Sequence, residues 1–202
     1  MKLYYLPGAC SLASHICLLE AGIEFEAFAV DRQTKRTTDG HDFTSINPKG
    51  YVPALVLDTG EVLTESAALL PYIGALNPAA HLIPIPGTLG YFRVAEWTAY
   101  VNSEVHKNFQ PMFRPGITEE AKDAARETVL KRYAYIESQL GEKAYLTGTA
   151  FTVADAYLYV TLSWTGRTGV DLSGLPRLQA LLERCRKRPC VIKARADEGL
   201  PA

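Results

Sequence analysis

The apolar positions of the first 77 residues alternate between strand-like and helix-like spacing. Short apolar runs predict strands over residues 2–6, 25–30, 52–57 and 61–63. Apolar residues recur at helical spacing over residues 10–20 and again over residues 64–76, where Thr64-Glu65-Ser66 supplies a helix start. With a polar loop over residues 31–42, this order predicts a small α/β sheet domain over residues 1–77.

The pattern changes after a cluster of breaker residues. Pro78, Pro84, Pro86 and Gly87 fall within residues 78–88, which we interpret as a domain linker. Beyond it, apolar residues at helical spacing predict long helices over residues 89–113, 118–140, 153–164 and 178–187, followed by a short tail. Residues 89–202 therefore predict an all-helical bundle. The fold class is α/β plus all-α.

Composition narrows the function classes. The 202 residues are 48% hydrophobic and 21% charged, with a formal net charge of −1, as in ordinary globular proteins. A net charge so close to zero produces no long-range electrostatic field that would attract nucleic acid or a membrane surface, so we expect neither partner. Neither a secretory signal nor an apolar run of spanning length is evident.

The four cysteines are Cys10, Cys17, Cys185 and Cys190. They are too few and too unevenly spaced for a secreted disulfide framework, and no His/Cys group has the spacing of a zinc site. We expect a cytoplasmic protein without a bound metal.

The first candidate for chemistry is Cys10, which follows a Pro7-Gly8 turn at the start of the first predicted helix. Unpaired N–H groups and the helix dipole favour an anion there, and they can lower a thiol pKa by about one to several units. The alternative is a small buried hydrophobe. Because position 13 is Ala13, a dithiol exchange motif is disfavoured.

Two further pairs could bind a peptide-like ligand. A cis Val52–Pro53 bond would present the Val52 backbone for pairing with a peptide main chain. The local sequence alone favours the alternative, an edge strand with trans-Pro53. Ser66 and its N–H could hold a carboxylate while Glu65 pairs with an ammonium group, although simple helix capping explains the same two residues.

Cys10, Val52-Pro53 and Glu65-Ser66, in this order, resemble the glutathione-binding half of the cytosolic glutathione transferases. The resemblance extends from Met1 to about Leu200. Residues 2–11, the Asn47-Pro48-Lys49-Gly50 turn and the segment over residues 103–107 resemble the beta class, found mainly in bacteria.

This resemblance implies a thioredoxin-like N-terminal domain of order βαβ-α-ββα, a C-terminal helical bundle, and a homodimer that binds glutathione as co-substrate between the domains. Catalysis in the class is attributed mainly to Cys10, which can hold glutathione as a mixed disulfide, with His106 close by. The residues implied in glutathione binding, some reaching across the dimer, are Tyr5, Cys10, Lys35, Val52, Pro53, Glu65, Ser66, Ser103, Glu104, Val105 and His106.

The first long helix after the linker carries a small and polar stripe. Ala99, Ser103, His106 and Gln110 share one face at spacings of four, three and four. The opposite face carries bulky groups suited to a core. The resemblance implies an asparagine at position 99, so Ala99 departs from the family pattern.

Several other residues are interpreted as structural. Thr152-Val153-Ala154-Asp155 has the pattern of a capping box that opens a helix. Tyr157 and Trp164 are expected in the core or an interface. The basic run over residues 184–188 is interpreted as the solvated end of a helix.

The sequence therefore predicts an enzyme that conjugates the glutathione thiolate to small electrophilic or hydrophobic molecules. Thiol–disulfide exchange through Cys10 is expected beside conjugation. Two alternatives remain: a non-catalytic carrier of hydrophobic ligands, and a glutathione-dependent reductive dehalogenase.

Overall fold

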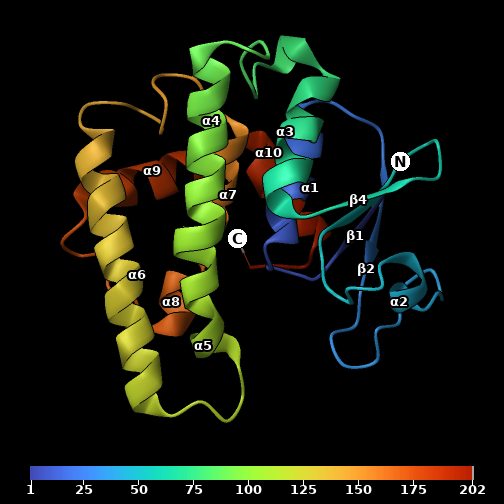
Figure 1. The fold of residues 1–202 in the computed structure, drawn as a ribbon, viewed down its shortest axis with the longest axis horizontal. Helices are drawn as coiled ribbons and strands as arrows, with labels where there is room; N and C mark the ends of the chain where they lie inside the picture. The colour runs from blue at the N-terminus through green and yellow to red at the C-terminus, as the bar shows by residue number, and fades with distance from the viewer. Residues whose placement is uncertain (202) are drawn as a thin grey trace.

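The structure, a computed structural model, describes residues 1–201. Residue 202, the last of the expected helical domain, lies outside the described residues. The fold class is confirmed: a small mixed sheet with flanking helices precedes a helical bundle (Figure 1).

The N-terminal half has the order implied by the resemblance, including a short second helix that apolar spacing alone did not predict. Its elements are β1 (Lys2–Tyr5), α1 (Ser11–Glu20), β2 (Glu26–Ala29), α2 (Phe43–Ile46), β3 (Ala54–Val56), β4 (Val62–Thr64) and α3 (Ser66–Leu76). The sheet order is β2-β1-β3-β4, with β1 parallel to β2 and antiparallel to β3, and with β3 antiparallel to β4.

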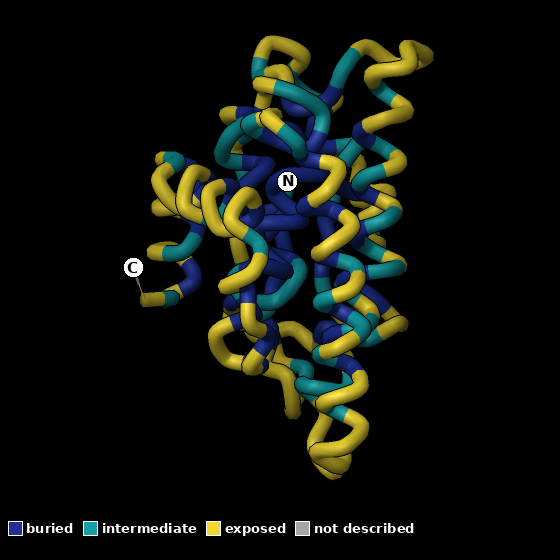
Figure 2. The backbone as a smooth tube through the Cα atoms, turned by 90° about the vertical axis from the view of Figure 1, so that its left-hand side faces the viewer, coloured by how far each residue is buried: buried dark blue, intermediate teal, exposed yellow. Residues whose placement is uncertain are grey.

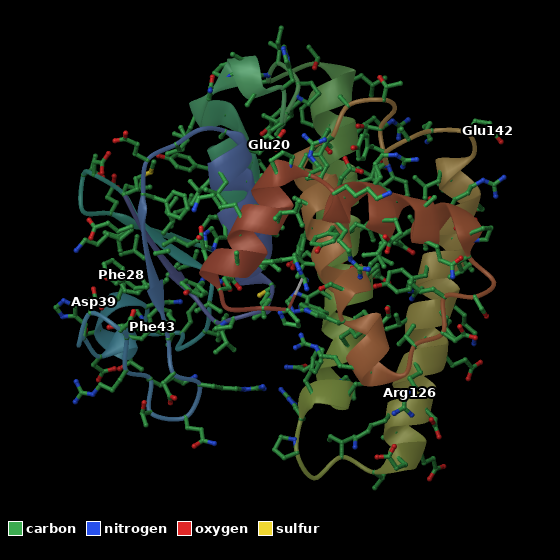
Figure 3. The ribbon with its side chains drawn as sticks, turned by 180° about the vertical axis from the view of Figure 1, so that it is seen from behind. Glu20, Phe28, Asp39, Phe43, Arg126 and Glu142 are labelled. Atoms are coloured by element: carbon green, nitrogen blue, oxygen red, sulfur yellow. The ribbon has the colours of Figure 1, made fainter. Side chains whose placement is uncertain are left out.

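Alternation along β1 gives the sheet two different faces. Leu3 and Tyr5 belong to the main core together with buried residues of α1 and α3. Tyr4 lies in a separate cluster, with its ring centroid 5.5 Å from that of Phe28 and 5.9 Å from that of Phe43. Figure 3 shows Phe28 and Phe43 beside the sheet at the α2 end. The aromatic residues of this cluster hold α2 and its loop against the sheet.

A short 3₁₀ turn, η1 (Pro78–Ala80), follows α3 and falls within the expected linker. The remaining elements are α4 (Leu89–Tyr100), η2 (Val101–Val105), η3 (His106–Phe109), α5 (Gln110–Phe113), α6 (Glu119–Leu140), α7 (Val153–Ser163), α8 (Thr165–Thr168), α9 (Pro176–Arg186) and α10 (Pro189–Asp197).

Helix α7 is the centre of the bundle. Every residue from Val153 to Leu162 is buried, because α7 packs against α1, α3, α4 and α9. Helix α1 in turn packs against α7 and α10, so the sheet domain and the bundle share one continuous core. Figure 2 shows this buried backbone in the middle of the molecule, with exposed loops around it.

Two expectations for the helical half are wrong. The single helix predicted over residues 89–113 contains a π-helical segment, η2, and a 3₁₀ segment, η3. Apolar spacing cannot reveal this change, because the buried Val101, Val105 and Phe109 keep a spacing of four throughout. The predicted tail after residue 187 is instead α10, which starts with a proline at its first position, where the missing N–H costs nothing.

Among the described residues, no helix has the length and apolar character needed to cross a membrane.

The capping box at the start of α7 is confirmed, and Asp155 is fully buried. Its carboxylate accepts from the N–H of Leu146 at 2.8 Å, from the N–H of Thr152 at 2.9 Å and from the Thr152 hydroxyl at 2.7 Å. The side chain thus joins the loop before α7 to the most buried helix of the protein.

We expect Asp155→Ala to lower the free energy of unfolding by about 3–4 kcal/mol, because it leaves three buried donors without an acceptor. The matched control is Asp171→Ala, since exposed Asp171 also accepts from a backbone N–H and a hydroxyl. The control should lose less than about 1 kcal/mol. Urea denaturation of both variants is the measurement, and equal losses would contradict the assignment.

Candidate functional site

A cavity of about 1110 Å³ lies between the sheet domain and the bundle. From the first domain it is lined by the turn after β1, the loop after β2, the Lys49–Pro53 turn and the β4–α3 junction. From the second domain it is lined by η2, η3, α5, α7 and α8. The cavity brings together Cys10, Lys35, Val52, Pro53, Glu65, Ser66 and His106.

Cys10 is the N-cap residue of α1 and is partly buried in this cavity. Its sulfur lies 3.4 Å from the carbonyl oxygen of Val52. The Val52–Pro53 bond is cis, so the trans interpretation that the local sequence favoured is wrong. Within residues 1–201, the Val52 N–H has no hydrogen-bond partner. An unpaired donor beside the thiol is therefore available to a ligand's main chain.

The pKa of Cys10 runs opposite to the expectation from a helix start. Burial, and to a smaller extent the negative charge of Glu65, raise the pKa of the thiol from its usual value to about 11. The backbone N–H groups of Ser11 and Cys10 and the Ser66 hydroxyl act in the lowering direction but do not offset burial. The expectation of a depressed pKa is therefore wrong, and Cys10 is a neutral thiol at neutral pH.

The β4–α3 junction places Glu65 and Ser66 as the sequence suggested. Ser66 is the first residue of α3, is 4% exposed and lines the cavity, where its hydroxyl acts on the Cys10 thiol. The first N–H groups of α3 have no partner within the helix. Glu65 has a positive φ of 67°, a conformation that costs about 1–3 kcal/mol and concentrates at functional sites. The ammonium beside its carboxylate is that of Lys49, at 2.7 Å.

Lys35 also lines the cavity from the first domain. Its ammonium group donates to the carbonyl oxygen of Gly50 at 2.9 Å. This contact holds the cation next to the turn that carries Val52, where it can meet a carboxylate from a bound peptide.

His106 contributes to a hydrogen-bonded group that the sequence did not predict. The Tyr157 hydroxyl donates to Oδ1 of Asn102 at 3.0 Å and lies 2.7 Å from Nδ1 of His106. With its proton committed to Asn102, the hydroxyl accepts from Nδ1–H, which leaves Nε2 as the unprotonated ring nitrogen. Burial, and secondarily Lys107, lower the pKa of His106 to about 4, so the imidazole is neutral.

Tyr157 was expected in the core or an interface, and its ring is indeed fully buried. Its hydroxyl nevertheless lies at the cavity, where burial raises its pKa well above the usual value and keeps it protonated. Trp164, seven residues later on the same face, also lines the cavity. That spacing of seven is the signal that could have identified the pair.

Four residues expected at the site do not line this chain's cavity. Tyr5 is buried in the main core, and its ring centroid lies 5.7 Å from that of His15. Val105 is fully buried in the main core. Glu104 pairs with Arg132 at 2.9 Å, and Ser103 is exposed outside the cavity. The implied glutathione contacts of these four residues stay predictions.

The π-helical segment explains why the residues of the predicted polar stripe do not all face the cavity. A π turn holds one residue more than an α turn, which rotates the following side chains by about 100° relative to a continuous α-helix. Ala99 and Ser103 are therefore exposed outside the cavity, whereas Asn102, His106 and Gln110 line it. The substitution at position 99 does not touch this chain's own cavity.

Residues of the second domain hold the turn before Cys10 through hydrogen bonds to the backbone of one residue, Gly8. The Gly8 N–H donates to the buried carboxylate of Glu198 at 2.8 Å. The Gly8 carbonyl accepts from the indole N–H of Trp164 at 2.8 Å and from the Arg167 guanidinium at 3.1 Å. Gly8 has a φ of 66°, which glycine adopts without cost. We call this set of contacts the Gly8 clamp.

Comparison with known proteins agrees with this geometry. Models for the glutathione S-transferase N-terminal and C-terminal domains match residues 8–76 and 97–189. The glutathione S-transferase GstA of Escherichia coli O157:H7 is 41% identical over 200 residues, which cover 99% of this chain and 100% of the relative. The chain therefore belongs to the glutathione S-transferase family.

Solved structures narrow this assignment. A sphingomonad glutathione S-transferase complexed with glutathione is 45% identical, has a TM-score of 0.96 and matches over 100% of both chains. The bacterial beta class enzyme of Sphingomonas chungbukensis matches with the same identity, coverage and TM-score. The expected resemblance to the beta class is confirmed.

The raised pKa of Cys10 predicts slow alkylation of the ligand-free protein at neutral pH, because only the thiolate reacts. The rate with iodoacetamide should rise with pH toward a midpoint near 11, the value set by burial. Mass spectrometry at increasing pH gives the profile, and Cys10→Ala corrects for the three buried cysteines. A midpoint below 8 would show that the helix start outweighs burial.

The Gly8 clamp predicts that Glu198→Ala lowers the free energy of unfolding by about 1.5–3 kcal/mol, since a buried N–H loses a charged acceptor. Glu198→Gln keeps one acceptor oxygen and the side-chain volume, so it should lose less. Guanidinium denaturation of the two variants separates hydrogen bonding from packing. Equal losses in both would leave the clamp without an energetic role.

Proposed function

We propose that this protein conjugates glutathione to small electrophilic molecules in the interdomain cavity. The observation that carries the proposal is the unpaired N–H of Val52, the residue whose carbonyl oxygen lies 3.4 Å from the Cys10 sulfur, in the same cavity as the carboxylate-binding groups Lys35 and Ser66. A tripeptide whose central residue carries a thiol and whose two ends carry carboxylates fits this arrangement. The family membership established above supports the same substrate.

The binding mode follows from the wall of the first domain. The Val52 backbone pairs with the main chain of the cysteinyl residue, as an added strand would. Ser66 and the start of α3 hold the carboxylate of the γ-glutamyl end, while Lys35 meets the carboxylate of the glycyl end. Glu65 is available to the ligand's ammonium group, which takes the place of the Lys49 ammonium.

The catalytic groups follow from their protonation. Cys10 keeps its proton at neutral pH and donates a hydrogen bond to the glutathione sulfur, which favours the ligand's thiolate. His106 is neutral, and its Nε2 accepts a hydrogen bond that orients the ligand's thiol. The hydrogen bonds from Nδ1 to Tyr157 and from Tyr157 to Asn102 hold the imidazole ring in this orientation. A base with a pKa of about 4 is a weak proton acceptor at neutral pH, so the thiol proton is released to solvent.

This chemistry favours conjugation over exchange through Cys10. An attacking thiol needs an appreciable thiolate fraction, and a thiol with a pKa of about 11 is almost fully protonated at neutral pH. A high pKa also makes Cys10 a poor leaving group from a mixed disulfide. Disulfide exchange is therefore a secondary activity in this proposal.

The proposed assembly is a homodimer formed through the face of α4. Leu89 is 71% exposed and Phe92 is 58% exposed on this helix, and Tyr51, at the cavity edge, is 59% exposed. Apolar exposure of this kind is typical of a protein–protein interface. In such a dimer, Ser103 and Glu104 can reach the partner's site, as the resemblance implies. A cytoplasmic location fits four unpaired cysteines.

The test is turnover of 1-chloro-2,4-dinitrobenzene with glutathione. We expect the parent to be active and Lys35→Ala to raise KM for glutathione by about 10- to 100-fold, with a smaller effect on kcat. Loss of a charge-assisted contact that is equally present in the ground and transition states has this signature. The matched control is Arg36→Ala, because Arg36 is the adjacent cation, is exposed and does not line the cavity.

An inactive parent that still binds glutathione in a calorimetric titration would instead support the carrier alternative. An unchanged KM in Lys35→Ala would remove Lys35 from the binding site while leaving the activity in place.

A further inference from the structure

The cavity is strongly cationic although the chain as a whole is not. Six lysine and arginine residues line it against a single acidic residue, Glu65, while the formal net charge of the chain is −1. The one acid already pairs with Lys49. The cations are Arg32, Lys35, Lys49, Lys107, Arg114 and Arg167.

Glutathione accounts for only part of this charge. Its two carboxylates are met by Lys35 and by Ser66 at the start of α3 in the proposed binding mode. Apart from Lys35, and from Lys49, which pairs with Glu65 in the ligand-free protein, four cations remain: Arg32, Lys107, Arg114 and Arg167. Within the part of the chain that the structure describes, none of these four forms an ion pair.

Two of these cations reach the cavity from different domains. Arg32 follows β2 of the first domain, and Arg167 belongs to α8 of the second. Burial, and secondarily the positive charge of Arg32, lower the pKa of Arg167. Like charges that share a cavity without an acid are stabilised by a bound anion.

Aromatic rings adjoin these cations. The guanidinium of Arg167 lies 5.0 Å from the ring centroid of Phe113, and the Phe113 ring lies 5.4 Å from Trp164 in an edge-to-face arrangement. The Trp164 ring is in turn 5.0 Å from the ring of His106, which belongs to the catalytic group. A flat aromatic ligand can therefore contact this wall while its polar substituent meets the cations.

We propose that the second substrate is an aromatic electrophile that carries a carboxylate. Its ring contacts the half-buried Phe113, which packs against the buried Trp164. Its carboxylate is held by Arg32 and Arg114, two exposed arginines of the same cavity lining. This inference rests on the proposed function and specifies the electrophile class for the same site.

For an aryl halide the reaction is a nucleophilic aromatic substitution. The glutathione thiolate attacks the ring carbon that bears the halogen, and a carbon–sulfur bond forms. The carbon–halogen bond then breaks, and the halide leaves with the electron pair. The proton of the thiol has passed to solvent beforehand, so no oxidant or reductant is consumed.

The test compares 4-chloro-3-nitrobenzoate with 4-chloro-3-nitrobenzamide. The two probes share leaving group, nitro group and shape, but only the first is an anion. For each probe, kcat/KM is divided by the rate constant of the uncatalysed reaction with glutathione, which removes their difference in intrinsic reactivity. The acid-to-amide ratio of these values measures the preference for charge.

We expect a ratio of about 10 or more in the parent, the size of one charge-assisted contact. Arg32→Gln and Arg114→Gln should each lower the ratio several-fold, and added salt should lower it as well. The matched control, Arg36→Gln, removes a cation from the same loop as Arg32 but outside the cavity, and it should keep the parent ratio.

A ratio of one or less in a parent that turns over 1-chloro-2,4-dinitrobenzene would overturn the inference while the transferase function stands. A ratio that survives both Gln variants would likewise overturn it, because the charge preference would then arise elsewhere. A parent without turnover of any of the three aryl halides would overturn the proposed function together with this inference.

Discussion

The Gly8 clamp is the interaction on which the site depends. Cys10 is only two residues beyond Gly8, and both polar groups of the Gly8 peptide unit are bonded to the helical domain. The position of the thiol in the first domain is therefore determined by Trp164 between α7 and α8, by Arg167 of α8 and by Glu198 after α10. Because Trp164 and Arg167 also line the cavity, one set of contacts positions the turn and shapes the second-domain side of the cavity.

Burial and charge act in opposite directions around the sulfur. Burial keeps Cys10 protonated, while the cations at the cavity mouth favour an anionic ligand. The protein therefore holds its own thiol neutral in a field that attracts another molecule's thiolate. A depressed Cys10 pKa would have placed two thiolates side by side, which costs several kcal/mol at short range.

Much of the first domain could be predicted from the sequence. The order of its strands follows from short apolar runs and turn residues, and Cys10, Val52 and Ser66 line one cavity as their positions on those elements suggested. The cis state of the Val52–Pro53 bond could not be predicted from local residues, because both isomers are compatible with a proline just before a strand. The strand that follows, β3, is central in the sheet and not the edge strand that the local sequence suggested.

The second-domain side of the site could not be predicted as well. Tyr157 and Trp164 have the apolar bulk of core residues, and only their polar atoms reveal a role, through contacts with segments about 50 to 150 residues away. The predicted stripe over residues 99–110 assumed constant helical geometry. A sequence pattern gives spacing along the chain, whereas the π segment changes the angle that each spacing represents.

The same π segment makes this helix sensitive to length rather than to composition. If one residue between 101 and 105 were deleted, a continuous α-helix would re-form and the two halves of the helix would turn relative to each other. The apolar residues would still be present, yet His106 would leave the cavity or Val105 would leave the core. Over evolutionary time, substitutions in this segment are thus easier to accommodate than insertions or deletions. The number of residues between Tyr100 and His106 is itself a requirement for placing His106 at the cavity.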